Sequence, residues 1–240
     1  MKILVTICAR GGSKGILKKN IKLLNNIPLI NYSIQNAKQI KDKWGAEISI
    51  SSDDEEILKT VKLMGIETDY IRPDILSGDE SGKIDTIKHV LLFEEKKHLT
   101  TFDYVIDLDV SSPLRNIDDI EKGFNIFKRD KEMLSLFSVN IANRNPYFNM
   151  VEKNKKTGYY EVIKPSDKII MSRQKANKVY DMNASFYWYR RSFFDQNHKS
   201  PITEKSGIYE MDHICFDLDH NLDFKFMEYL LKNNELDFNL

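Results

Sequence analysis

Short apolar runs alternate with longer amphipathic segments along the first 140 residues. The run 2–8 is apolar and stops at a glycine-rich turn, which is typical of a strand buried on both faces. Similar runs predict further strands at 47–51, 67–71, 104–108 and 134–140. Because amphipathic segments separate these runs, the order is βαβα. Right-handed crossovers of that kind favour a doubly wound, mostly parallel α/β sheet with helices on both faces.

The intervening segments carry apolar residues three or four positions apart, as an amphipathic helix requires. Their apolar faces are formed by Ile30, Ile34, Ala37 and Ile40, by Ile57, Val61 and Met64, by Ile84, Ile87 and Leu91, and by Ile117, Ile120, Phe124 and Phe127. Asp53 stands just before the second of these helices, where a carboxylate accepts hydrogen bonds from the first backbone amides. We therefore expect Asp53 to be its N-cap.

The pattern changes after residue 143. Stretches 147–152 and 159–163 are β-like and flank the polar turn 153–158, which predicts an antiparallel hairpin. We expect the region of about 143–182 to protrude from a single domain that spans 1–240. It is a candidate dimerisation surface, or equally a lid.

The last 60 residues are predicted to return to the main sheet. Runs 184–189 and 214–218 are strand-like, and Leu222, Phe226 and Leu230 share one face of a closing helix.

The charges of the chain cancel, with 36 basic and 36 acidic residues. A chain without a net field is not drawn to nucleic acid or to an anionic membrane, so any anionic ligand must be met by local charge. No apolar run approaches the roughly 20 residues that span a bilayer, and the N-terminus lacks the pattern of a signal peptide. We therefore expect a cytoplasmic protein.

A glycine-rich loop follows the first predicted strand and comprises Ala9, Arg10, Gly11, Gly12, Ser13, Lys14 and Gly15. At the carboxyl end of a strand, glycines let the backbone approach phosphate groups. Positive charge to neutralise a triphosphate is supplied by Arg10, Lys14, Lys18 and Lys19. The spacing fits neither GxGxxG nor GxxxxGK[ST], which disfavours a dinucleotide fold and a P-loop NTPase. Taken alone, the loop is either a phosphate site or a flexible surface turn.

Asp217 and Asp219 are two positions apart in a predicted strand, so both side chains point to the same face. Two such carboxylates can converge on Mg²⁺, which also takes phosphate oxygens and water. The alternative is that one of them caps the following helix and the other is solvated.

Several motifs together resemble one family. The loop CARGGSKGILKKNI at 8–21 is similar to the signature loop of the acylneuraminate (CMP-sialic acid) cytidylyltransferases. Further motifs agree with that family in order and spacing: SSDDEEI (51–57), RPDILSGDES (72–81), SSPLR (111–115), SRQ (172–174) and FDLD (216–219). The resemblance covers nearly the whole chain, and several ordered matches are far more specific than one loop.

The resemblance implies an enzyme that transfers CMP from CTP to a sugar acid, with Mg²⁺ as cofactor and a homodimer as the assembly. It implies that Arg10 and Lys14 hold the CTP phosphates with Ser13 and Asn20 nearby, and that the segment from Asp79 to Ser81 contacts cytosine or ribose. It also implies that Asp217 and Asp219 bind the magnesium. The residues that it places toward the sugar acid are Arg173, Gln174, Asn183 and Ser185.

The SSPLR motif follows the predicted strand 104–108, so Ser111, Ser112 and Arg115 are expected at the carboxyl edge and near the sugar acid. Members of the family often have Gln two residues before this turn, whereas Asp109 stands here. An acid cannot present an amide donor. Asp109 therefore shifts the expected acceptor from N-acetylneuraminic acid toward legionaminic or related bacterial nonulosonic acids, unless water simply fills the gap.

The expected reaction is an in-line attack of the anomeric hydroxyl on the α-phosphorus of CTP, with release of pyrophosphate. Positioning and charge neutralisation by Arg10 and Lys14 would dominate, and Asp217 or a metal-bound water would take the proton. Two rivals remain. One is another sugar nucleotidyltransferase, such as a 3-deoxy-manno-octulosonate or glucose-1-phosphate enzyme, and the other is a non-catalytic nucleotide-binding protein.

Overall fold

The computed structural model describes residues 1–13, 15–78, 81–166, 170 and 172–240, without the side chain of Arg173. Its core is a six-stranded sheet in the order β10-β6-β9-β5-β1-β4. These strands are β1 (Ile3–Cys8), β4 (Glu47–Ser51), β5 (Tyr104–Leu108), β6 (Ser135–Ile141), β9 (Tyr180–Arg190) and β10 (Ser206–Glu210). Strand β1 pairs in parallel with β4 and β5, β6 pairs in parallel with β10, and β9 runs antiparallel between β5 and β6. The predicted mostly parallel α/β sheet is confirmed.

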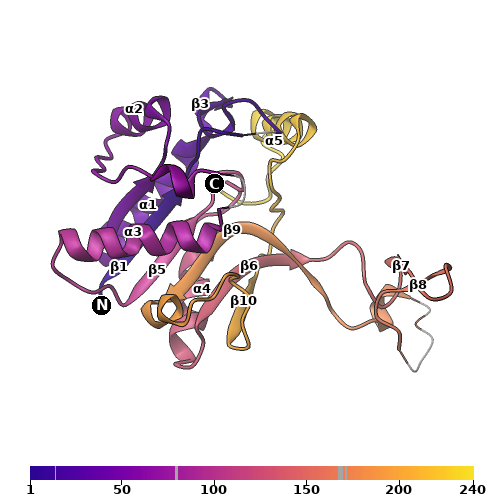
Figure 1. The fold of residues 1–240 in the computed structure, drawn as a ribbon. Helices are drawn as coiled ribbons and strands as arrows, with labels where there is room; N and C mark the ends of the chain where they lie inside the picture. The colour runs from indigo at the N-terminus through magenta and orange to yellow at the C-terminus, as the bar shows by residue number, and fades with distance from the viewer. Residues whose placement is uncertain (14, 79–80, 167–169, 171) are drawn as a thin grey trace.

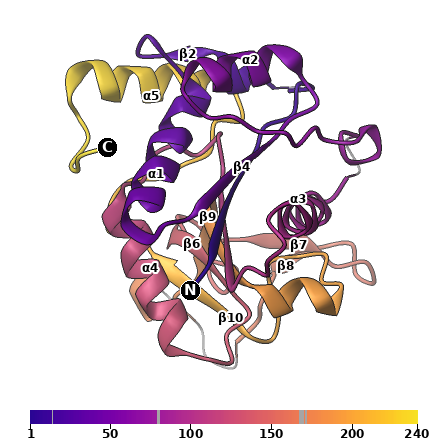
Figure 2. The ribbon, with the colours of Figure 1, turned by 90° about the vertical axis from the view of Figure 1, so that its left-hand side faces the viewer.

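Helices cover both faces of this sheet (Figure 2). Helices α1 (Leu29–Trp44), α4 (Ile117–Arg129) and α5 (Asn221–Asn233) contribute to one apolar layer, together with α2 (Glu55–Leu63). Helix α3 (Lys83–Lys97) contributes to the other layer. Alternate residues of β1 explain the division, because Ile3, Val5 and Ile7 belong to the first layer and Leu4 to the second.

Short elements complete the body at its surface. They are η1 (Lys19–Ile21), β2 (Leu23–Leu24), β3 (Ile27–Pro28), η2 (Asp74–Leu76) and η4 (Arg191–Gln196). No helix among the described residues is long and apolar enough to cross a membrane.

Three local predictions are wrong. Residues 67–71 are not a strand; they run beside β4 with isolated bonds such as Thr68 Oγ1 to the Ile50 carbonyl, 3.3 Å. Residues 214–218 are not a strand either, and the strand that returns to the sheet is β10. The cap of α2 is Asp54, which accepts from the amides of residues 56 and 57, whereas Asp53 faces the glycine-rich loop.

The described residues between 142 and 179 form an arm that projects from the sheet (Figure 1). It holds the antiparallel pair β7 (Val151–Lys153) and β8 (Tyr160–Val162), which confirms the predicted hairpin, and the short η3 (Arg173–Lys175). Strand β6 enters the arm at Ile141 and β9 leaves it at Tyr180, and these two residues are paired. The arm therefore starts and ends at the same point of the sheet.

Candidate active site

A cleft opens at the carboxyl ends of the central strands, where open α/β sheets bind ligands. It consists of two adjoining cavities of about 220 and 300 Å³ that share Cys8, Arg10 and Asp109. The first is also lined by Arg72, Leu76, Gly78, Ser81, Lys83 and Thr86. The second is also lined by Ser13, Gly15, Lys19, Asn20, Ser111 and Asp219. Residues from the loop, SSPLR and FDLD motifs therefore meet in one cleft although they lie far apart in the chain.

The glycine-rich loop is held by contacts that need glycine. The Gly11 amide donates to Asp53 Oδ1 at 3.0 Å, and a β-carbon on Gly11 would lie 2.7 Å from Asp54 Oδ2. A β-carbon on Gly15 would lie 2.2 Å from the backbone oxygen of Asp219, so no side chain fits there. The loop therefore packs directly on two acidic segments.

Of the remaining loop residues, some anchor the loop to its neighbours and others are exposed. Ala9 is buried and its amide donates to the Ser51 carbonyl at 2.9 Å, which extends the β1–β4 pairing. Asn20 Nδ2 donates to the Arg10 carbonyl at 2.8 Å, while Gly12 is exposed. Lys14 and Asp79 lie outside the described residues, and Ser81 Oγ donates to a backbone carbonyl of η2.

Asp109 belongs to a buried charge cluster at the end of β5. The Lys83 ammonium lies 2.8 Å from Asp107 Oδ2 and 2.5 Å from Asp109 Oδ2. Asp109 Oδ1 accepts from the amide and the hydroxyl of Ser111 at 2.9 and 2.8 Å. Burial alone would raise the pKa of Asp109, but the Lys83 charge and these hydrogen bonds lower it to about 2. Asp109 is therefore ionised at neutral pH.

Four residues expected near the sugar acid lie beneath the cleft and do not line its two cavities: Ser112, Arg115, Asn183 and Ser185. Arg115 is fully buried and its Nη1 donates to the backbone carbonyls of Asp109, Ser112 and Ser185. Ser112 Oγ donates to the Asn183 carbonyl at 2.6 Å. Burial lowers the pKa of Arg115 to about 10, which still leaves it charged at neutral pH. Their contacts fix the turn that carries Asp109.

The FDLD segment reaches the cleft as an irregular strip, so the strand geometry expected for Asp217 and Asp219 is wrong. The Leu218 amide donates to the Ser111 carbonyl at 2.9 Å and anchors the strip. Asp219 is exposed, with Lys19 Nζ 3.8 Å from its Oδ1. Asp217 Oδ1 is buried without a hydrogen-bond partner among the described residues. Burial, together with the charges of Asp109 and Asp219, raises the pKa of Asp217.

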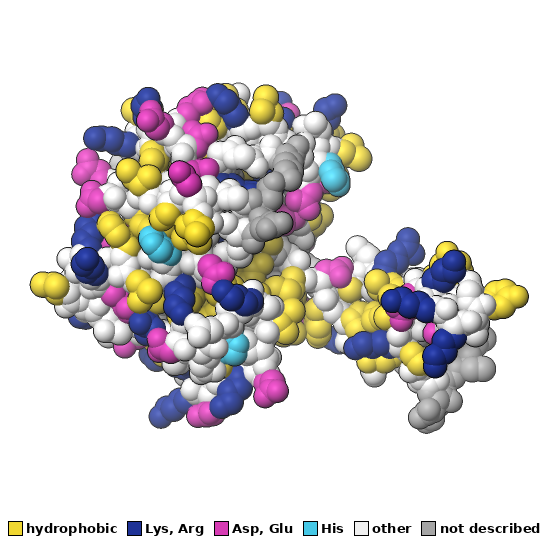
Figure 3. Space-filling model, in the orientation of Figure 1, with side chains coloured by type: hydrophobic (Ala, Val, Ile, Leu, Met, Phe, Trp, Pro, Cys, Tyr) yellow, Lys and Arg dark blue, Asp and Glu magenta, His cyan; other side chains and the backbone are white. Residues whose placement is uncertain are grey.

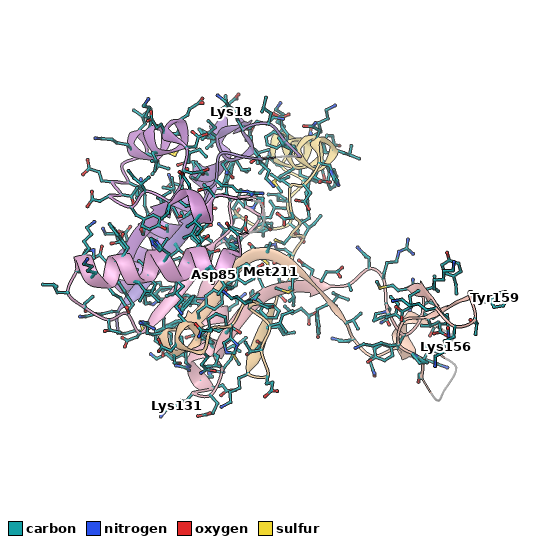
Figure 4. The ribbon with its side chains drawn as sticks, viewed as in Figure 1. Lys18, Asp85, Lys131, Lys156, Tyr159 and Met211 are labelled. Carbon is teal, nitrogen blue, oxygen red and sulfur yellow. The ribbon has the colours of Figure 1, made fainter. Side chains whose placement is uncertain are left out.

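The SRQ motif is not brought to this cleft. It lies on the arm, where Gln174 is exposed and Arg173 belongs to the same short turn. The arm leaves the carboxyl edge at the end of β6, and Figure 1 shows its β7–β8 hairpin well away from β1 and α2. Figure 3 shows basic and hydrophobic side chains over the arm, and Figure 4 shows Lys156 and Tyr159 at its tip. The exposed hydrophobic residues of the arm include Val151, Tyr159 and Tyr160.

Two residues of the cleft, Arg72 and Lys83, were not singled out as site residues from the sequence. Arg72 is buried and its guanidinium holds the Ser51 hydroxyl and carbonyl, both at 2.9 Å. Lys83 begins α3. Lys19, which was expected to help neutralise a triphosphate, lines the second cavity, and its Nζ donates to the Leu218 carbonyl at 2.8 Å. Arg72 lies inside the RPDILSGDES motif, so its position in a recognised motif could have identified it as a site residue. Lys83 carried no local signal because its partners come from a distant strand.

The cleft brings cationic and anionic groups close together, since Lys19 and Asp219 line the same cavity. Arg10 and Lys19 stand with the backbone of the glycine-rich loop and suit phosphate groups, whereas Asp217 and Asp219 suit a hard cation. Cys8 lines both cavities, but burial raises the pKa of its thiol well above the usual range, so it is not a thiolate nucleophile. The arrangement suits transfer between two bound substrates rather than covalent catalysis by Cys8.

Comparison with known proteins gives one consistent result. The family model for cytidylyltransferases matches residues 4–238. "Post-translational flagellin modification protein B" of Campylobacter coli is 41% identical over 236 residues, which cover 98% of this chain and 97% of that protein. "CMP-N,N'-diacetyllegionaminic acid synthase" of Campylobacter jejuni is 39% identical over 240 residues, with 98% and 97% covered. "Pseudaminic acid cytidylyltransferase" of the same species is 28% identical over 98% of both chains.

Solved structures agree on the fold. The structure of CMP:2-keto-3-deoxy-manno-octonic acid synthetase complexed with CTP superposes with a TM-score of 0.70 at 18% identity, covering 98% of this chain and all of that one. The structure of 4-diphosphocytidyl-2C-methyl-D-erythritol synthase from Anaerococcus prevotii gives a TM-score of 0.59 at 14% identity, with 96% and 98% covered. At these identities the likeness is one of fold.

Proposed function

The chain belongs to the cytidylyltransferase family and is a nucleotidyltransferase, and we propose that it transfers CMP from CTP to the anomeric hydroxyl of a nonulosonic acid, with release of pyrophosphate. The family resemblance found in the motifs is confirmed. The observation that carries the proposed reaction is the meeting of the glycine-rich loop with the Asp217–Asp219 strip, because it sets a phosphate site against a cation site.

The proposed acceptor is of legionaminic type. Two relatives at 39 and 41% identity over nearly the whole chain support it, one of them named as a CMP-N,N'-diacetyllegionaminic acid synthase. Pseudaminic and neuraminic enzymes are less similar, at 28% and at 22 to 31% identity. The 3-deoxy-manno-octulosonate alternative has the support of fold alone.

The proposed magnesium site passes a test of fit. Asp217 has a buried oxygen without a hydrogen-bond partner among the described residues and a raised pKa, and Asp219 follows on the same strip. A cation there would satisfy that oxygen and offset the mutual repulsion of the acids. Asp217 and Asp219 would hold it, and when bound it would neutralise charge on the CTP phosphates.

The side chains of the cleft would then act mainly by position and charge. Arg10 and Lys14 would hold the phosphates of CTP, with Lys19 nearby. The Asp79–Ser81 segment and Arg72 would hold the nucleoside in the first cavity. The proton of the attacking hydroxyl would go to the Asp217 carboxylate or to a water beside it.

The arm supports the proposal of a homodimer. Arg173 and Gln174 can meet an acceptor only if an arm reaches a cleft, and within one chain the two are apart (Figure 1). An arm that enters the cleft of a second copy would satisfy that requirement and cover the exposed Tyr159 and Tyr160. A cytoplasmic location, where CTP is available, is part of the same proposal.

The test is a pyrophosphate-release assay with CTP, UTP, GTP and dTTP against legionaminic, pseudaminic and sialic acids and 3-deoxy-manno-octulosonate. We expect turnover with CTP and Mg²⁺, highest for a legionaminic-type acid and abolished by chelation. Mg²⁺ alone should also raise the melting temperature. At a concentration ten times its Kd, it should increase the free energy of unfolding by about 1.4 kcal/mol. Turnover with another nucleotide, or with none of these acids, would overturn the proposed function.

A further inference from the structure

Arg72 is a buried arginine on the wall of the first cavity. It is 6% exposed and lines the cavity proposed for the nucleoside. Its Nε donates to the Ser51 hydroxyl and its Nη2 to the Ser51 carbonyl, both at 2.9 Å. Its backbone amide donates to the Ser52 carbonyl at 3.0 Å. The guanidinium is therefore held by the last residue of β4, through the hydroxyl and the carbonyl together.

The contacts with Ser51 leave one edge of the Arg72 guanidinium for a ligand. A guanidinium has five N–H donors in a fixed plane. Nε and Nη2 share one edge of that plane, and Ser51 takes one donor from each. No described residue accepts from the three donors that remain on Nη1 and Nη2. Because the plane is rigid, the contacts with Ser51 also set the direction of the free edge at the cavity wall.

The Ser51 hydroxyl is itself held by a second hydroxyl. Ser51 is fully buried, and since its oxygen accepts from Arg72, its own hydrogen is free for another partner. Burial raises the pKa of Tyr70, and a hydrogen bond from the Ser51 side chain acts against that rise. The Tyr70 hydroxyl lies 2.8 Å from Nδ1 of His89 on α3. Hydrogen bonds thus link the cavity wall to α3 through Ser51 and Tyr70.

Ser49 has the same surroundings as Ser51 without the link to the cleft. It lies two positions earlier in β4, so both side chains point to the same face of the sheet. Both are fully buried. The Ser49 hydroxyl donates to Glu94 Oε1 at 2.7 Å, and Ser49 lines neither cavity of the cleft. Removing either hydroxyl costs one buried hydrogen bond, but of the two residues Ser51 alone contacts a side chain of the cleft.

We propose that Ser51 is a positioning residue for nucleotide binding, which directs the free edge of Arg72 into the first cavity, and that Tyr70 fixes the Ser51 hydroxyl. This rests on the proposed function, in which Arg72 holds the nucleoside of CTP. A side chain that is already held loses less conformational freedom when a ligand binds, so the affinity is higher. The effect concerns CTP and not the acceptor, because Ser51 acts through Arg72.

The test measures CTP binding by calorimetry with Mg²⁺ present, and steady-state kinetics with CTP and a legionaminic-type acid. In Ser51→Ala we expect the Kd and the KM for CTP to rise about fivefold or more. The kcat and the KM for the acceptor should stay within about twofold of wild type. Ser49→Ala is the matched control, which should lower the melting temperature by a similar amount and leave the KM for CTP unchanged.

Two further variants show whether Ser51 acts through Arg72. Tyr70→Phe should raise the KM for CTP less than Ser51→Ala does, and should add nothing in the Ser51→Ala background. Arg72→Lys keeps the positive charge, so CTP binding stays measurable, but it lacks the rigid plane that Ser51 orients. In the Arg72→Lys background, Ser51→Ala should therefore change the Kd for CTP by less than about twofold.

The outcomes distinguish this inference from the proposed function. A wild type that binds CTP without transferring CMP would reject the proposed function and leave the calorimetric test of Ser51 standing, whereas a wild type that does not bind CTP would overturn both. The role of Ser51 would be rejected by an unchanged affinity of Ser51→Ala for CTP, by an equal loss in Ser49→Ala, or by the full effect of Ser51→Ala in the Arg72→Lys background.

Discussion

The Asp107–Asp109 pair and the Asp217–Asp219 pair have the same spacing but opposite surroundings. The first pair ends strand β5 and encloses the Lys83 ammonium, and the pKa of Asp109 is lowered to about 2. The second lies on an irregular strip with Asp217 Oδ1 unpartnered among the described residues, and the pKa of Asp217 is raised. A pair that carries its own cation is a finished structural unit. The second pair has only the Lys19 ammonium nearby, 3.8 Å from Asp219 Oδ1, and is the pair for which a bound cation is proposed.

The substitution Asp217→Asn tests this difference between the two pairs with the largest expected effect. If Asp217 holds a cation and receives a proton, turnover should fall at least 100-fold, or about 2.7 kcal/mol of transition-state stabilisation. The melting temperature without metal should be unchanged or higher, since an unpaired buried charge is removed. Pyrophosphate release and a thermal melt measure the two effects. The exposed Asp212→Asn is the control, and a loss of stability as large as the loss of activity would contradict the assignment.

For the Asp107–Asp109 pair, removal of its cation Lys83 is expected to reduce the stability of the fold. Lys83→Met should lower the free energy of unfolding by about 2 kcal/mol, less than the 3 to 5 of a fully buried pair because Lys83 is 35% exposed. Lys83→Met/Asp107→Asn should recover most of it. Urea denaturation of both variants measures the difference. Equal stability of the single variant and wild type would show that Asp107 does not depend on this cation.

Lys14 lies outside the described residues, and its proposed role depends on bound CTP. Lys14→Ala is expected to reduce turnover at least tenfold, roughly 1.4 kcal/mol, because a cation that neutralises phosphate charge is lost. Stability without CTP should be unchanged. Steady-state pyrophosphate release measures it, with the exposed Lys59→Ala as control. Unchanged release would remove Lys14 from the phosphate site.

The smallest expected effect is a pair of opposite pH profiles, measured with metal chelated. The folded pKa of Asp109 is about 2 and lies below its ordinary 3.8, so its stabilisation is present above pH 3.8 and declines as pH falls, by about 1 kcal/mol at pH 3. The folded pKa of Asp217 is raised, so its contribution is present below pH 3.8 and is lost as pH rises through the folded value. Asp109→Asn and Asp217→Asn should therefore remove profiles of opposite slope from urea-denaturation free energies. If both substitutions changed the pH dependence of the unfolding free energy in the same direction, the two aspartates would have similar rather than opposite surroundings.

Much of the fold followed from local pattern. Short apolar runs located β1, β4, β5 and β6, because these strands are buried. Helical spacing located the helices between them, because each has one apolar face. Residues 67–71 have the composition of a strand but run beside β4 without a continuous ladder. β10 was missed because the short run at 206–210 contains glycine and lacks clear alternation.

The site was predictable where its residues are neighbours in the chain. The glycine-rich loop and the FDLD strip were recognised as motifs, and both reach the cleft. Lys83 was not found because its partners, Asp107 and Asp109, are 24 and 26 positions away on a strand, and only the packing of α3 against the sheet brings them together. The buried position of Arg115 likewise depends on β9, which supplies the Ser185 carbonyl.

The pairing of Ile141 with Tyr180 has a consequence for how this protein can diverge. Both ends of the arm sit on one rung of the sheet, so the arm can be lengthened, shortened or exchanged without moving the register of β6 or β9. The cost of closing such an insertion grows slowly, by about 0.6 kcal/mol for each doubling of its length. The sheet can thus be inherited unchanged while the arm varies in length and sequence. Related proteins can therefore acquire different arms while each of them still folds.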